Sequence, residues 1–282
     1  MGGPKAFKKL LAQKAIMMIS FSKNKLKNFF WTWRQQHTRL PICPSAVVSD
    51  LFVWRSSDQW QTAFELIDIP SLFEDAIALR NVLIIFFNKN GQYLFEKKIK
   101  LLPNCRNTFD ISSLVGKLYG EMGTFAVFHS ETLPKIKEFG SFITERGYIS
   151  YKYLDSPLRT YVHGNFDAVA RCRDGRLQLL GGSSFLYRVY NLQFCFFPDH
   201  DYEIMVVNPS SVKQKFIFGI YSYITKNNIS LKILNIPSGG MQLIPIRVKT
   251  MDAVRVIIKS HLVLARPLVF SFKNHKVNVF HG

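Results

Sequence analysis

The stretch Val82-Leu-Ile-Ile-Phe-Phe87, followed by Asn88-Lys-Asn-Gly91, carries the clearest fold signal in the chain. A short apolar run rich in β-branched and aromatic residues, bounded by turn formers, is typical of a buried strand. Asn and Gly adopt positive φ readily, so residues 88–91 predict a hairpin turn into a second strand over 92–101. We therefore expect an antiparallel hairpin here.

Similar short apolar runs, broken by Asn, Gly, Pro, Asp or Ser, continue from residue 45 to the end of the chain. Regular short strands with polar turns favour a β-sandwich or a barrel, and only 71–79 and 111–119 suggest short helical turns. The expected strands are 46–54, 62–67, 82–87, 92–101, 108–111, 124–129, 185–196, 202–207, 215–224, 230–234, 241–248, 254–260 and 268–272.

The two halves of the chain show a similar order of features. Each has a strand, a turn, a second strand, a Pro-containing turn, and a last strand that ends in His beside Ser. This order predicts a mainly β protein of two tandem, duplicated β-sandwich units with an N-terminal basic amphipathic helix. The expected divisions are a basic arm over 1–40, a first sandwich over 45–132, a Tyr/Arg-rich linker or loop segment over 133–182, and a second sandwich over 183–282.

The net charge of +18 is unevenly distributed along the chain. Residues 1–40 carry +9, residues 41–150 carry −1 and residues 151–282 carry +10. Such segregation indicates surfaces that meet an anionic partner, although a generally lysine-rich composition is an alternative explanation. No apolar run is long enough for a membrane-spanning helix, so we expect a cytoplasmic protein.

Residues 5–33 combine lysines with an apolar stripe that includes Phe7, Leu11 and Met18 at helical spacing, followed by Trp31 and Trp33. A basic amphipathic helix of this kind can lie on an anionic membrane surface, which would make the protein peripheral to a membrane. It can equally be a targeting segment, or a helix that packs its apolar face on the body of the protein.

From Val206-Val-Asn-Pro-Ser210 through Leu268, the second half resembles the family of sensory rhodopsin transducers. Members of that family pair an Asn-containing strand with a long hairpin, a turn rich in small residues, and a strand that ends before a polar segment. The resemblance covers about a quarter of the chain. It implies an oligomeric β-sandwich with a binding role, and hence a homo-oligomer.

The densest polar group lies between Glu145 and Asp167 and lacks the alternation of a core strand. Tyrosine rings stack on sugars, while Arg, Asn and His bond ligand oxygens, so the segment predicts a site for a glycan or another anionic ligand. The alternative is a linker packed between two units. The candidate ligand-binding residues are Tyr148, Tyr151, Arg159, Tyr161, His163, Asn165 and Asp167.

Motifs for other chemistry are missing from the sequence. There is no G-x-S-x-G elbow, no phosphate loop, no zinc spacing and no C-x-x-C pair, so we expect no cofactor, no metal and reduced cysteines. Asp199 and Asp201 are interpreted as turn formers. Nucleic-acid binding rests on the basic second half alone, without an RNA-binding signature. The sequence thus favours a non-catalytic binding or scaffolding protein; the alternative is an enzyme that acts on a carbohydrate or phosphorylated substrate through residues 145–167.

Overall fold

The computed structural model describes part of the chain, and only that part is treated below. The described residues are 43, 46–68, 80–129, 144–145, 147–154, 156–164, 168–192, 195–248, 252–262, 266–274 and 276–282. The chain divides between His37 and Thr38 into two units, and all described residues belong to the second. The basic amphipathic helix expected over 1–40 therefore lies outside them.

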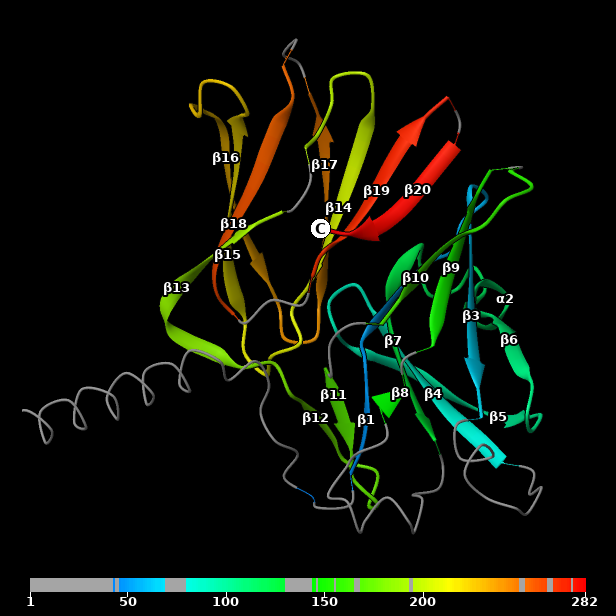
Figure 1. Ribbon diagram of the computed structural model, residues 1–282. Coiled ribbons are helices and arrows are strands. Elements are labelled where there is room, and N and C mark those ends of the chain that lie inside the picture. The colour runs from blue at the N-terminus through cyan, green and yellow to red at the C-terminus, as the bar shows by residue number, and fades with distance from the viewer. Residues whose placement is uncertain are drawn as a thin grey trace, which may run out of the picture. The chain divides into compact units, whose positions relative to one another are not determined.

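In this part of the chain the strands form five four-stranded sheets and are accompanied by one short helix, α2 (Ile111–Val115). The protein is mainly β, as expected (Figure 1). The first sheet consists of β2 (Phe52–Arg55), β7 (Met122–His129), β4 (Arg80–Asn88) and β5 (Tyr93–Leu101). The second, here called the β3–β9 sheet, consists of β10 (Thr160–His163), β9 (Tyr148–Tyr153), β3 (Trp60–Ile67) and β6 (Arg106–Asp110).

The C-terminal half supplies two more sheets. One, here called the β15–β18 sheet, consists of β13 (Ser183–Asn191), β18 (Val254–Leu262), β15 (Gln214–Ser222) and β16 (Asn228–Ile236). The other, the β14–β19 sheet, consists of β17 (Met241–Arg247), β14 (Asp201–Val207), β19 (Leu268–Lys273) and β20 (Lys276–His281). The fifth sheet consists of β12 (Leu177–Leu179), β11 (Val169–Arg171), β1 (Val47–Ser49) and β8 (Thr144–Glu145).

The prediction of two tandem β-sandwich units joined by a linker is wrong. Five sheets of four strands are the inventory of a five-bladed β-propeller. Each sheet combines one hairpin of consecutive strands with strands from elsewhere in the chain, so the sheets are not built from consecutive segments. The order β2-β7-β4-β5 recurs in β13-β18-β15-β16, and the order β6-β3-β9-β10 recurs in β17-β14-β19-β20. This relation joins four of the five sheets and leaves the fifth, β12-β11-β1-β8, outside any two-unit scheme.

The segment 133–182, expected as a linker, contributes β8 to β12. Figure 1 shows β9 and β10 beside β3, which precedes them by more than eighty residues in the chain. The sequence shows where strands occur but not which distant strand each one pairs with, and this pairing makes the segment part of two sheets.

The hairpin signal at 82–101 is confirmed by β4 and β5, which pair in antiparallel fashion around Gly91 at φ 78°. The continuous apolar run is buried on both faces. Val82, Ile84 and Phe86 belong to the main core, whereas Ile85 packs with Ala126 and Val169 on the opposite face. A strand covered on both sides explains why the run shows no polar alternation.

Packed side chains connect neighbouring sheets face to face. One core joins the first sheet to the β3–β9 sheet and includes Met205 and Phe270 of the β14–β19 sheet. A second core joins the other face of that sheet, through Ile204, to Phe218 and Ile258 of the β15–β18 sheet. The β14–β19 sheet is thus buried on both faces.

Cys43 and Cys172 form a disulfide with 5.8 Å between the Cα atoms, so the expectation of four reduced cysteines is wrong for this pair. Pairing over 129 residues leaves no local spacing signal in the sequence. Cys105 and Cys195 are free thiols.

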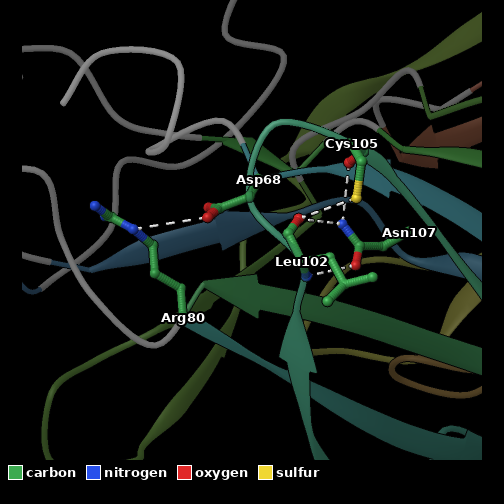
Figure 2. A network of polar contacts seen from close by, with 5 residues as sticks. All are labelled: Asp68, Arg80, Leu102, Cys105 and Asn107. Atoms are coloured by element: carbon green, nitrogen blue, oxygen red, sulfur yellow. Dashed lines mark hydrogen bonds and ion pairs between the residues drawn. The ribbon is translucent and has the colours of Figure 1, made fainter. Parts of the chain in front are cut away.

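Figure 2 shows the polar contacts at the end of β5 and at the entrance to β4. Asn107 closes the β5–β6 turn, since its Oδ1 accepts from Leu102 N at 2.8 Å and its Nδ2 donates to the carbonyl oxygens of Leu102 and Cys105. Arg80 and Asp68, both buried, form an ion pair at 3.7 Å. These groups fix the strand ends beside the β3–β9 sheet without facing solvent.

Candidate functional site

The outward face of the β3–β9 sheet brings together polar and aromatic side chains from four strands. Successive residues of a strand point to opposite faces, so Ile149 and Tyr151 face the core while Tyr148 and Ser150 face outward. The strand pairing then gives two adjacent outward rows across β10, β9, β3 and β6: His163, Tyr148, Glu65 and Thr108 in one, and Tyr161, Ser150, Ala63 and Asp110 in the other.

Tyr161 lies across this face. Its hydroxyl donates to Glu65 Oε1 at 3.2 Å, although Tyr161 is on β10 and Glu65 is two strands away on β3. The side chain therefore reaches past Ser150 on β9 and Ala63 on β3, two small residues that are both buried. Tyr161 nevertheless remains 47% exposed, so part of its side chain is open to solvent.

Glu65 is the polar centre of the face. Its side chain is 9% exposed, and Oε2 pairs with Arg106 Nη1 at 3.2 Å, while Arg106 itself is 70% exposed. Arg106 has five N–H donors and uses only part of them on Glu65, so the remainder can face a ligand. Tyr148, 55% exposed, is the strand neighbour of Glu65. We call Glu65, Arg106, Tyr148 and Tyr161 the tyrosine face.

Two of the candidate residues from the sequence, Tyr148 and Tyr161, belong to this face, but Tyr151 does not. Tyr151 is fully buried, its hydroxyl donates to Val53 O at 2.7 Å, and burial raises the pKa of its phenol. Its assignment as a ligand-binding residue is wrong, because its position in the strand turns it into the core. Arg159 lies half-buried between β9 and β10, and Asn165 and Asp167 lie outside the described residues.

His163 lies at the end of β10, beside β20. Its ring centre is 5.0 Å from that of His281, whose Nε2 lies 2.8 Å from the His163 carbonyl oxygen. Both histidines line a cavity of about 60 Å³, and Asp50 and Arg266 line it as well. The volume suits one or two waters rather than a sugar ring. Gly164 is required there, because a Cβ at this position would lie 1.7 Å from Asp50 Oδ2.

A larger, open groove of about 590 Å³ lies along the β14–β19 sheet. Its charged groups pair with each other: Asp199 contacts Lys273 at 2.5 Å and His200 at 2.7 Å, and Asp201 lies 3.8 Å from Arg247. The hydrogen bonds from Lys273 and then His200 lower the pKa of Asp199 to about 2. The third acid that lines the groove, Glu203, pairs with Arg55, so all three acids are engaged in ion pairs.

Within the described ranges, no group of three or more His, Cys, Asp or Glu side chains is placed to hold a metal ion. In the same residues, no helix has the length and hydropathy needed to cross a membrane. Comparison of the sequence with family models and with curated proteins gives no match. The resemblance to sensory rhodopsin transducers therefore stays a prediction.

Glu65 and Arg106 were not among the candidates from the sequence. A signal for Glu65 was present, since it is the one acid within the expected apolar strand 62–67. Arg106 gave no signal, because only the pairing of β6 with β3 brings it beside Glu65.

Proposed function

We propose that the protein is a non-catalytic binding protein that holds a glycan on the tyrosine face. The observation that carries the proposal is the partly exposed side chain of Tyr161, which is positioned by the hydrogen bond from its hydroxyl to the buried Glu65. A sugar ring offers C–H groups to such an aromatic surface and hydroxyls to the groups around it.

The surrounding charges support a neutral or weakly acidic sugar rather than a highly charged polyanion. Glu65 balances Arg106 within the face. Arg106 still offers a planar donor fork, which suits hydroxyl or carboxylate oxygens. Tyr148 and Tyr161 occupy diagonal positions on paired strands, about 7–8 Å apart, so two neighbouring sugar units can contact both rings.

The experiment is a calorimetric or NMR titration of the full chain with panels of neutral and acidic oligosaccharides. Tyr161→Ala removes the stacking surface and should weaken binding by about 2 kcal/mol, roughly thirtyfold. Tyr161→Phe keeps the ring but loses the hydroxyl that bonds Glu65, so its affinity should lie between those of Tyr161→Ala and the wild type. Equal affinity of Tyr161→Ala and the wild type, with intact melting behaviour, would overturn the proposal.

Arg106→Gln separates the two kinds of sugar. A contact between the guanidinium and a carboxylate contributes more than one to a hydroxyl, so the loss should be larger for acidic than for neutral oligosaccharides. An equal loss on both panels would show that Arg106 serves only to hold Glu65 in place.

For the alternative, an enzyme that acts through residues 145–167, the described residues supply no pair of catalytic carboxylates in this segment. The side chains of Glu145, Asp155 and Asp167, the carboxylates expected between 145 and 167, all lie outside the described residues. A hydrolase of the common type requires two carboxylates at a set separation across the sugar.

The cytoplasmic location expected from the sequence stays a prediction. The Cys43–Cys172 disulfide weighs against it, since such bonds persist mainly in oxidising compartments. Alkylation of thiols in freshly broken cells, followed by mass spectrometry of Cys172, measures whether this cysteine is reduced or bound in the disulfide in the cell.

A further inference from the structure

The outward face of the β15–β18 sheet carries an apolar surface that is distinct from the tyrosine face. The strand pairing aligns two outward rows, Ile233, Ile217, Lys259 and Val189 in one and Leu231, Gly219, Ile257 and Asn191 in the other. A third, shorter row pairs Tyr221 with Arg255.

The edge strand β16 turns its apolar residues outward. Ile229, Leu231 and Ile233 are 47%, 55% and 51% exposed. The alternate residues Ser230 and Lys232 point to the other side of the strand and are exposed as well. An amphipathic strand normally buries its apolar set. Val189 on β13, at 56% exposed, extends this surface to the opposite edge of the sheet.

The charges on this sheet all have one sign. The four strands contain five basic residues and no acid, and Lys215, Lys259 and Arg255 project on the outward face. The Arg255 guanidinium lies 5.7 Å from the ring centre of Tyr221, on the same face as the apolar residues. Apolar side chains with a rim of cations complement a surface that is both apolar and negatively charged.

We propose that this face, defined by Ile229, Leu231, Ile233, Val189 and Lys259, docks the protein on an anionic lipid membrane. Isoleucine and leucine side chains enter the boundary between headgroups and acyl chains, while Lys and Arg contact acidic headgroups. A second copy of the chain fits less well, because docking two such faces brings like charges together with no acid to offset them. None of these residues belongs to the expected membrane segment 5–33, which lies outside the described residues.

The test is co-sedimentation of the full chain with vesicles of phosphatidylcholine alone and of phosphatidylcholine mixed with phosphatidylserine. The wild type should partition onto the mixed vesicles and be released by salt. The variant Ile229→Thr, Leu231→Thr, Ile233→Thr keeps strand-forming residues and should lower the partition coefficient about tenfold or more. Lys259→Glu should lower it about tenfold on mixed vesicles only.

A matched control removes as many exposed apolar side chains from elsewhere. Leu102, Leu118 and Leu158 are 62%, 91% and 74% exposed, and their replacement by Thr should leave the partition unchanged. All variants keep residues 5–33, so binding through that segment alone would make the β16 variant sediment like the wild type and would overturn the proposal. Absence of wild-type binding would overturn it too, as would a concentration-dependent dimer that the β16 variant abolishes while vesicle binding persists.

Discussion

The ion pair between Arg55 on β2 and Glu203 on β14 is the sharpest test of how the sheets are held together. Arg55 Nη1 lies 2.5 Å from Glu203 Oε2, and the side chains are 7% and 26% exposed. The guanidinium also lies 3.6 Å from the ring centre of Trp60. Burial lowers the pKa of Arg55, and Glu203 opposes that effect by favouring the charged form. The cation therefore depends on Glu203 as its counter-charge.

The perturbation is Glu203→Gln, which keeps the shape of the side chain and removes its charge. Breaking a fully buried pair from one side costs about 3–5 kcal/mol, because a charge is left without its partner. Glu203 is a quarter exposed, so water can reach the site, and the Gln carbonyl still accepts one hydrogen bond. We therefore expect a loss of about 2–3 kcal/mol in unfolding free energy, which corresponds to roughly 4–10 °C in melting temperature.

The assay is urea unfolding followed by tryptophan fluorescence, with thermal melting as the second measurement. Asp201→Asn is the matched control, since Asp201 is also on β14 but pairs with Arg247 at 3.8 Å with both side chains mostly exposed. Exposed pairs contribute about 0–1 kcal/mol, so this variant should stay close to the wild type. A further variant that replaces both Arg55 by Met and Glu203 by Leu should recover much of the loss. If Glu203→Gln and Asp201→Asn are equally stable, the reasoning from burial is refuted.

Three other predictions follow from single contacts. Cys172→Ser, or reduction of its disulfide, opens a loop of 129 residues and should cost up to about 5 kcal/mol in a melting assay, whereas Cys105→Ser should not. Tyr151→Phe loses the hydrogen bond to the β2 backbone and should cost about 1–2 kcal/mol in urea unfolding. Because burial raises the pKa of Tyr151, its contribution to stability is present below about pH 10 and is lost as the pH rises further. The difference in stability between the wild type and Tyr151→Phe should therefore shrink above about pH 10. Burial lowers the pKa of His281, so its contribution to stability is present above about pH 6.5 and is lost as the pH falls through the lowered pKa. The melting temperature of His281→Asn should therefore depend less on pH between about pH 7 and 5 than that of the wild type.

The sequence predicted the local structure of β4 and β5 but not what their turn contacts. Gly91 was expected for its positive φ, which the structure confirms. A Cβ there would also lie 2.2 Å from Ser238 O, and Met241 N donates to Lys89 O in the same place. Gly91 thus has a second, long-range constraint, which the pattern of residues around it in the sequence does not predict.

The tyrosine face was half predictable for a different reason. The segment 148–153 was interpreted as loop because its polar residues showed no alternation. If tyrosine is counted as apolar, the alternation is present: Ile149, Tyr151 and Tyr153 turn toward the core, and Tyr148 and Ser150 turn outward. Tyrosine can serve on either face, since its ring packs in a core when its hydroxyl finds a partner, as that of Tyr151 does. Residue type alone could not separate the buried tyrosines from the exposed ones.

The apolar face of β16 shows how register decides what alternation leaves open. A strand was correctly expected over 230–234, and its period of two offers two sets of side chains. Burying the set that contains Ile229, Leu231 and Ile233 would be the simplest choice. Pairing instead places Leu234 opposite Phe216, which leads Ile236 into the core, and a shift by one residue would reverse every side chain of the strand. Ile236 is buried and Leu234 is half-buried against the second core, so this register turns the other set outward. The exposed apolar surface is a consequence of the register, and an edge strand that retains it against the cost of solvent contact is best explained by a partner surface that covers it.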